Sequence, residues 1–261
     1  KGLSKAGVER IDTFFKEAIQ SDRMPGSVIA IARNGKLVLY KSYGYLDKSK
    51  STPMPINAVF SLASMTKVMT TVGALTYYEE GKLPLNAPIA QWLPQFGQMK
   101  VGVMKDGAFT TVPAKARITF QDLMRHTSGL TYGGRPDTAG ASASRYPATG
   151  DLPVMSSAKE FVSRVTQLPL VYQPGTTFEY STSFEMLGAV IEKVSGKRLG
   201  AYLKQVIWDP LGMKDTSFQV SDDQRSRVAH GFANDPLTGK PQVIHPVQKN
   251  PTFDCGGGCA F

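Results

Sequence analysis

The chain has 261 residues, of which 41% are hydrophobic, so it is long enough to bury a sizeable core in one large domain or two modest ones. Thirty basic residues against 21 acidic residues give a net charge of +9, but the basic residues are scattered and form no cluster interleaved with aromatic residues. This pattern argues against a nucleic-acid partner, and the absence of any run of about 20 apolar residues argues against a membrane span.

The first 25 residues predict an amphipathic helix. Ser4 is a plausible N-cap, and Pro25-Gly26 ends the pattern. Apolar residues recur between these points at helical spacing, at Val8, Ile11, Phe14, Phe15 and Ile19.

Residues 27–47 predict a β-hairpin. Two β-rich runs flank Asn34-Gly35, the pair that best tolerates the positive backbone angles of a two-residue turn. We therefore expect two antiparallel strands here.

Residues 64–80 predict a helix that carries a serine and a lysine on one face. With about 100° of rotation per residue, the apolar side chains of this helix cover one arc of its surface. Ser64 lies at one edge of the arc, and Lys67 lies outside the arc, about 60° from Ser64. The arc contains Met65, Val68, Met69, Val72, Leu75 and Thr76. The hydroxyl and the amine are therefore one turn apart on a helix that we expect to be mostly buried.

Lys67 is the only charged residue between Leu62 and Tyr78. Burial lowers the pKa of a lysine, and a partly neutral amine can take the proton of a serine. Ser64 would lie at the helix N-terminus, where unpaired N–H groups and the helix dipole favour negative charge. The alternative is that Ser64 is only an N-cap and that Lys67 extends to water.

From about residue 81, loops rich in Pro and Gly alternate with short helical segments. We expect three regions: the N-terminal part of an α/β domain at 1–80, a helical subdomain at 81–230, and a returning, incomplete segment at 231–261. Residues 132–153 form a long loop of small residues, of a kind that often covers a site.

Residues 173–197 predict a second helix of interest. Thr182 and Glu185 fit the T-x-x-E capping box, and Gly196 fits a C-cap. A helix that starts at Thr182 leaves Tyr180 just outside it. This phenol could carry protons if a nearby ammonium lowered its pKa, and the alternative is a core tyrosine with a satisfied hydroxyl.

Four stretches together carry a family resemblance. Ser64-Met65-Thr66-Lys67, within "AVFSLAS" and before "LTYYEEGKLPLNAPIAQWLP", resembles the first box of the serine β-lactamase and penicillin-binding-protein superfamily. Residues 118–130, 172–196 and 203–218 resemble its class C β-lactamase and family VIII carboxylesterase branch. The resemblance implies an α/β plus all-α fold of the β-lactamase/transpeptidase type, in which an antiparallel sheet is flanked by helices and joined to a helical subdomain.

The same resemblance implies roles for particular residues. Ser64 would be the acylated nucleophile, Lys67 its proton acceptor or electrostatic partner, and Tyr180 the general base and acid, with Lys67 and Tyr180 acting as one coupled unit. We expect Thr182 and Tyr132 to contact the substrate. No cofactor and no metal is implied.

The sequence departs from the family pattern in two places. The tyrosine box, usually Tyr-x-Asn, is Tyr180-Ser181-Thr182, so the amide that often contacts an acyl side chain is missing. No Lys-Thr-Gly or His/Trp-Gly-Gly box follows, and "CGGGCAF" resembles the glycine-rich stretch that precedes that box. We therefore expect a chain truncated before the C-terminal strands, and one that by itself hydrolyses substrates poorly.

The favoured function is hydrolysis of small acyl esters through an acyl-enzyme on Ser64. One alternative is a β-lactamase or D-alanyl-D-alanine carboxypeptidase acting on an amide, and another is a non-catalytic relative that binds acyl or peptide ligands. The expected partner is a small-molecule ester or amide. The oligomeric state stays open, and we favour a periplasmic or secreted location over a cytoplasmic one.

Other chemistries have weaker support. A Ser-His-Asp hydrolase would need a Gly-x-Ser-x-Gly elbow, which "GASAS" at 140–144 only half matches. His126, His230 and His245 lack metal-ligand spacing, and we expect His126 to be structural. Cys255 and Cys259 could form a local disulfide or remain two free thiols, and we assign them no chemistry.

Overall fold

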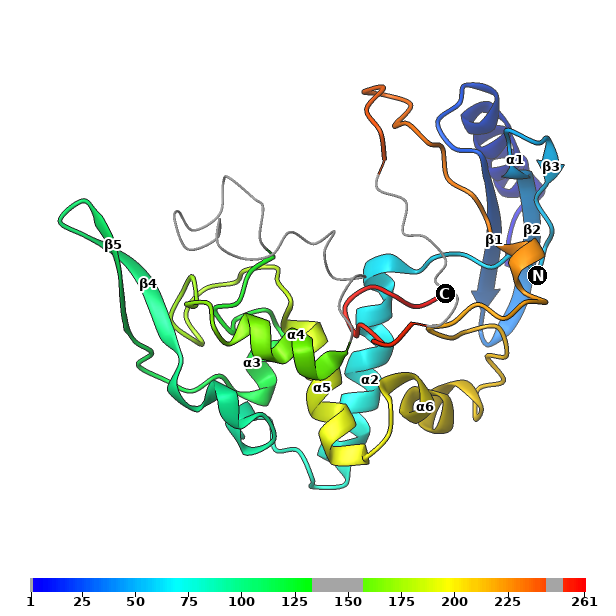
Figure 1. Cartoon of the computed structure of the whole chain (residues 1–261). Helices are drawn as coiled ribbons and strands as arrows, with labels where there is room; N and C mark the ends of the chain where they lie inside the picture. The colour runs from blue at the N-terminus through cyan, green and yellow to red at the C-terminus, as the bar shows by residue number, and fades with distance from the viewer. Residues whose placement is uncertain (1, 133–156, 243–250) are drawn as a thin grey trace. The chain divides into compact units, whose positions relative to one another are not determined.

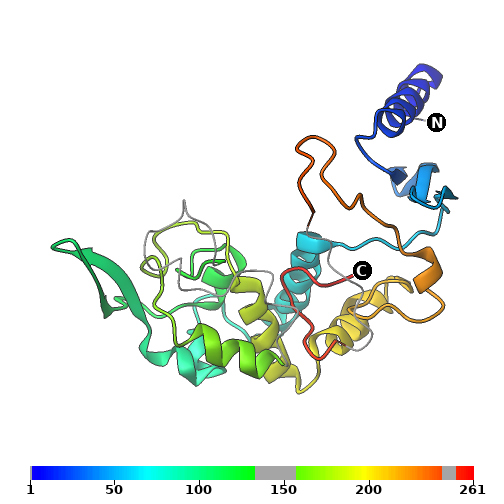
Figure 2. The ribbon, with the colours of Figure 1, turned by 45° about the horizontal axis from the view of Figure 1, so that its top comes forward.

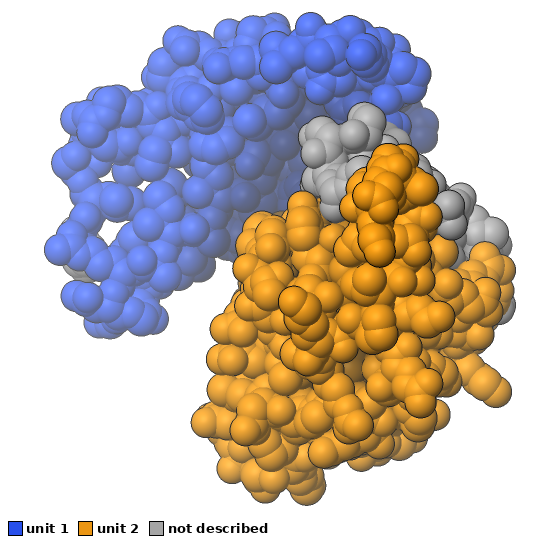
Figure 3. Space-filling model, turned by 90° about the vertical axis from the view of Figure 1, so that its left-hand side faces the viewer, with its two compact units in different colours: residues 1–61, 220–248, 261 blue, residues 62–219, 249–260 orange. Residues whose placement is uncertain are grey.

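The computed structural model describes residues 2–132, 157–242 and 251–261. The chain divides into two compact units, one made of Lys1–Ser61, Val220–Gln248 and Phe261, the other of Leu62–Gln219 and Lys249–Ala260 (Figure 3). The regions 1–80, 81–230 and 231–261 remain a sequence-based proposal about the organisation of the chain.

The first unit contains the predicted helix and hairpin. Helix α1 (Lys5–Gln20) begins where the Ser4 hydroxyl accepts a hydrogen bond from the Gly7 N–H at 3.0 Å. Strands β1 (Gly26–Arg33) and β2 (Lys36–Asp47) pair antiparallel around Asn34 and Gly35, whose φ angles are 50° and 71°. Strand β3 (Thr52–Pro53) adds to β2 in the order β1-β2-β3, so both sequence predictions are confirmed (Figure 1).

The second unit is mainly helical. It contains the short helix η1 (Ala63–Met65), helix α2 (Thr66–Glu79), and α3 (Phe120–Met124), α4 (Ala158–Val165), α5 (Ser183–Ser195) and α6 (Leu199–Leu203). The short helices η2 (Ile89–Gln91) and η3 (Pro94–Gln98) lead into the hairpin β4 (Lys100–Lys105) and β5 (Ala108–Pro113). A π-helical turn, η6 (Lys204–Trp208), follows α6. The predicted combination of an α/β part and an all-α part is therefore confirmed.

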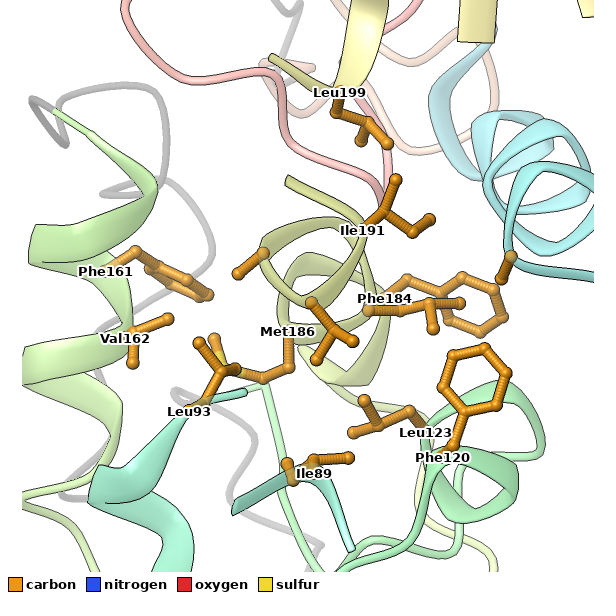
Figure 4. Close-up of a cluster of buried hydrophobic side chains, with 14 of the residues drawn as sticks. Ile89, Leu93, Phe120, Leu123, Phe161, Val162, Phe184, Met186, Ile191 and Leu199 are labelled. Atoms are coloured by element: carbon orange, nitrogen blue, oxygen red, sulfur yellow. The ribbon is translucent and has the colours of Figure 1, made fainter. Parts of the chain in front are cut away.

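Helix α5 is the centre of the hydrophobic core. Every residue from Ser183 to Ile191 is buried. In Figure 4, Phe184, Met186 and Ile191 extend from α5 among side chains contributed by η2, α3, α4 and α6. The labelled neighbours are Ile89, Leu93, Phe120, Leu123, Phe161, Val162 and Leu199. Gly196, with a φ of 66°, ends α5 as the sequence predicts.

The buried face of helix α2 is not the one that the sequence predicts. The predicted apolar arc is largely exposed, with Met65 and Val68 at 62% and 66%, whereas the face with Thr66, Lys67 and Thr70 is buried. Gly73 lies on the buried face, where a Cβ atom would come within 2.4 Å of Leu203 Cδ2. Close approach to a neighbouring helix, rather than hydrophobicity, therefore selects the buried face of α2.

Helices α2 and α5 pack against each other and lie side by side in both ribbon views (Figures 1 and 2).

Within the described residues, every helix is too short or too polar to cross a bilayer.

Candidate active site

Ser64, Lys67 and Tyr180 meet in the second unit. Lys67 Nζ donates a hydrogen bond to Ser64 Oγ at 3.2 Å, and the Tyr180 hydroxyl donates to the same oxygen at 2.5 Å. Ser64 and Tyr180 are 116 positions apart in sequence. The structure thus brings together the three side chains that the sequence singles out.

The start of α2 fixes Ser64. Ala63 has a φ of 44°, and Ser64 follows it within the tight turn η1 that continues into α2. The N–H of Leu62 donates to the Ala260 carbonyl at 2.9 Å, which ties this turn to the C-terminal segment. Ser64 is exposed, so its hydroxyl is open to a substrate at a helix N-terminus.

Lys67 is buried, at 7% exposure, and its amine has three hydrogen-bond acceptors. They are Ser64 Oγ at 3.2 Å, the Tyr132 hydroxyl at 3.2 Å and the Gly257 carbonyl at 2.6 Å. The amine also lies 4.7 Å from the centroid of the Tyr180 ring.

A disulfide closes the glycine-rich segment that holds Lys67. Cys255 and Cys259 are bonded, with Cα atoms 5.4 Å apart, which decides between the two alternatives that the spacing leaves open. Between them, the carbonyls of Gly256 and Gly257 accept hydrogen bonds from Thr70 at 2.8 Å and from Lys67 at 2.6 Å. Two of the three glycine carbonyls between the cysteines are thus bonded to α2.

The pKa of Tyr180 is lowered from its ordinary value. Burial raises it, but hydrogen bonds with Lys67 and Ser64 and the positive charge of Lys67 outweigh that effect. The phenol therefore gives up its proton more readily than a free tyrosine, which a proton carrier requires.

His126 holds the Tyr180 segment in place. Its Nδ1 accepts a hydrogen bond from the Ser181 N–H at 3.1 Å, and its ring lies 4.6 Å from the Tyr180 ring and 5.0 Å from the Phe184 ring. Burial, together with the charge of Lys67, lowers the pKa of His126 to about 4. The imidazole is therefore neutral at pH 7, with its proton on Nε2, in the structural position that the sequence predicts.

Thr182 is the N-cap residue of α5 as predicted, but the predicted capping box is wrong. The Thr182 side chain makes no capping hydrogen bond, and within the described residues its buried Oγ1 has no hydrogen-bond partner. Glu185, the other half of the expected box, is 2% exposed and lies against Gly257, beside Lys67 and Tyr132. The sequence missed this position of Glu185 because T-x-x-E is also a common local cap.

Tyr132 is buried, and its hydroxyl accepts from Lys67. Contacts of Thr182 and Tyr132 with substrate remain predictions. The rest of the loop at 132–153, "GASAS" and His245 lie outside the described residues. Over the described ranges, no group of three or more His, Cys, Asp or Glu residues is placed to hold a metal ion.

Comparison with known proteins adds three findings. The Beta-lactamase family model matches residues 11–252. An uncharacterized protein of Mycobacterium tuberculosis is 32% identical over 247 residues, which cover 93% of this chain and 60% of that protein. Esterase EstB of Burkholderia gladioli is 30% identical over 222 residues, 85% of this chain and 54% of EstB. The chain therefore spans only a little more than half the length of these relatives.

Among solved structures, EstCE1, described as a hydrolase with promiscuous acyltransferase activity, superposes with a TM-score of 0.75 at 25% identity. The match covers 97% of this chain and 68% of EstCE1. The fold is therefore of the β-lactamase/transpeptidase type, as the sequence predicts.

Proposed function

This chain belongs to the Beta-lactamase family, and from that premise we propose that it is a serine hydrolase that cleaves small acyl esters through an acyl-enzyme on Ser64. The observation that carries the proposal is that the side chains of Lys67 and Tyr180 both contact one oxygen atom, Ser64 Oγ. An amine and a phenol both lie within hydrogen-bond distance of Ser64 Oγ, at 3.2 and 2.5 Å. A serine hydroxyl is a weak nucleophile at neutral pH and needs such partners to lose its proton.

In the first half-reaction, Tyr180 acts as the phenolate beside the Lys67 ammonium, and Ser64 Oγ attacks the ester carbonyl carbon while its proton passes to the Tyr180 oxygen. The Lys67 ammonium and the Ser64 N–H at the start of α2 stabilise the negative charge that develops. The alcohol then leaves with a proton from Tyr180, and the acyl group stays on Ser64.

In the second half-reaction, water gives a proton to Tyr180 and attacks the acyl carbon. The bond to Ser64 Oγ breaks, the oxygen takes back a proton, and the carboxylic acid leaves. The contrast between an exposed Ser64 and a buried Lys67 supports this scheme, because the nucleophile is open to substrate while the charge is shielded from water.

Two observations support an ester rather than a β-lactam as substrate. Thr182 stands where the family usually has the asparagine whose amide often contacts an acyl side chain. In addition, the relative EstB is named an esterase, and EstCE1 a hydrolase with acyltransferase activity. These names concern those proteins and favour the same class of reaction here.

Covalent labelling tests the proposal. The native protein is treated with a fluorophosphonate and with a fluorescent penicillin, beside Ser64→Ala and the exposed-serine control Ser163→Ala on α4. We expect fluorophosphonate labelling that Ser64→Ala abolishes and the exposed-residue change Ser163→Ala keeps, and we expect Ser64→Ala to lose whatever hydrolysis of p-nitrophenyl butyrate the native protein shows.

Preferential, Ser64-dependent reaction with the penicillin would instead indicate a β-lactamase or peptidase. No Ser64-dependent label from either probe would indicate a non-catalytic binder and overturn the proposal.

A further inference from the structure

Glu185 is a buried carboxyl group that the scheme above does not use. It lies in the first turn of α5, is 2% exposed, and accepts hydrogen bonds from its own N–H and from the Tyr132 hydroxyl. Within the described residues, its Oε2 has no hydrogen-bond partner. A carboxyl group this deeply buried is costly unless a nearby positive charge stabilises it.

That positive charge is Lys67, and Tyr132 connects the two. The Tyr132 hydroxyl accepts from Lys67 Nζ at 3.2 Å and donates to the Glu185 carboxyl group. A phenol can accept and donate at once, so this bridge is chemically complete. Together with the two contacts at Ser64 Oγ, it makes a continuous line of contacts from Glu185 through Tyr132 and Lys67 to Ser64 and Tyr180.

We propose that Glu185 is a positioning residue that balances the charge of Lys67 through Tyr132 and thereby sets the pH at which Ser64 is activated. This inference rests on the proposed function, because the activated group is the Ser64 hydroxyl. It assigns the buried carboxyl group a role in tuning the catalytic pair, without direct contact with substrate.

The carboxyl group of Glu185 lies against Gly257. An added Cβ on Gly257 would come within 2.2 Å of Glu185 Oε1, so the carboxyl group packs directly against the backbone whose carbonyl holds Lys67. The N-cap residue Thr182 makes no capping bond, so a local cap does not account for the acid at this position.

The charged and titratable groups around Glu185 leave Lys67 as its main partner. His126 has a pKa of about 4 and is neutral at pH 7, while Glu179 accepts a hydrogen bond from Thr131. Asp254, in the C-terminal segment, is paired with Arg198. Lys67 is thus the charge that acts on Glu185, Tyr132 is its side-chain hydrogen-bond partner, and Tyr180 is the phenol that its charge affects.

The direction of the effect follows from charge. Burial raises the pKa of Glu185 to about 7, while Lys67 and the hydrogen bonds lower it, so the group changes charge near neutral pH. Ionised Glu185 raises the pKa of Tyr180. A neutral side chain at position 185 would therefore let Tyr180 lose its proton at lower pH.

Glu185→Gln tests this inference, because it keeps the size of the side chain and removes its charge. The measurement is the second-order rate of Ser64 labelling by a fluorophosphonate as a function of pH, on the native protein. We expect the acid-side midpoint of Glu185→Gln to move down by about one pH unit. The matched control is Glu192→Gln, two turns further along the same helix. Glu192 is partly buried and accepts a hydrogen bond from the Leu199 N–H, and its substitution should leave the midpoint unchanged.

A second variant and a second readout keep the test decisive. If Glu185→Gln fails to fold, Tyr132→Phe cuts the bridge and should move the midpoint in the same direction by a smaller amount. The pKa of Tyr180, read from the tyrosinate absorbance that Tyr180→Phe removes, should fall in Glu185→Gln whether or not the protein turns over esters.

An unchanged midpoint, an equal shift in Glu192→Gln, or an unchanged Tyr180 titration would overturn the role of Glu185. Loss of all Ser64-dependent labelling in the native protein would instead refute the proposed function, and the Tyr180 titration would then decide the role of Glu185 alone.

Discussion

Helices α2 and α5 lie side by side and supply opposite halves of the candidate site, but they are buried by different means. Helix α5 presents large apolar side chains to the core, and every residue from Ser183 to Ile191 is buried. Helix α2 turns its buried residues Thr66, Lys67, Thr70, Gly73, Ala74 and Tyr77 inward, and Met65 and Val68 are exposed.

The difference shows what each helix is built to do. Helix α5 gains its stability from apolar burial, which fixes Tyr180 at its N-terminal end. The small and hydroxyl side chains of α2 let two neighbours come close: the C-terminal segment, which bonds Lys67 and Thr70, and α6, which meets Gly73. We therefore expect substitutions to act through lost packing in α5 and through steric overlap in α2.

The largest expected effect breaks the apolar packing of α5. Ile191→Ala removes a fully buried side chain and should lower the free energy of unfolding by about 4 kcal/mol. Val68→Ser, at 66% exposure on α2, should change it by less than about 0.5 kcal/mol. Urea unfolding of both variants measures the contrast. A comparable loss in Val68→Ser would mean that the apolar arc of α2 is buried in solution, and the comparison would fail.

The next effect concerns His126, which packs against Phe184 of α5 and against Tyr180. Its pKa of about 4 in the folded protein is below the ordinary 6.5, so the folded state binds this proton less tightly than the unfolded state. The stability due to neutral His126 is thus complete above pH 6.5 and is lost as the pH falls toward 4.

Between pH 7 and pH 4.5, the native protein should therefore lose about 2–3 kcal/mol more unfolding free energy than His126→Asn. Asparagine suits this position because His126 has a φ of 57°. Equal losses in the two proteins, measured by urea unfolding at both pH values, would show that this imidazole is not held neutral by burial.

The smallest of the three effects tests the close approach in α2. Gly73→Val places a side chain against Leu203 and should cost about 2 kcal/mol through overpacking. The control is Gly97→Val, where an added Cβ meets nothing within 4 Å. Thermal unfolding should show a clear drop only for Gly73→Val, and similar melting temperatures for the two variants would argue against a tight contact between α2 and α6.

The parts of the site that depend on local spacing were predictable from the sequence. Ser64 and Lys67 are one helical turn apart, and the turn and cap signals around Thr182 placed Tyr180 just before α5. The third acceptor of Lys67, the Gly257 carbonyl, comes from a segment 190 positions away, which no periodicity reveals.

Two local patterns misled for identifiable reasons. The T-x-x-E pattern fits a capping box, but it fits equally well an acid that points into the protein from the first turn of the helix. Only the charges that surround the acid distinguish these two cases. The hydrophobic arc of α2 pointed to the wrong face, because Gly73 contributes close contact without contributing hydrophobicity.

The contact between Glu185 and Gly257 has a consequence for how this protein can vary. Any side chain at position 257 would displace the Glu185 carboxyl group, since a Cβ atom there would lie 2.2 Å from Glu185 Oε1. In related chains, the two positions should therefore change as a pair: a bulkier residue at 257 should be accompanied by a shorter one at 185. A substitution that looks mild at either position alone would then be tolerated only in the presence of its counterpart.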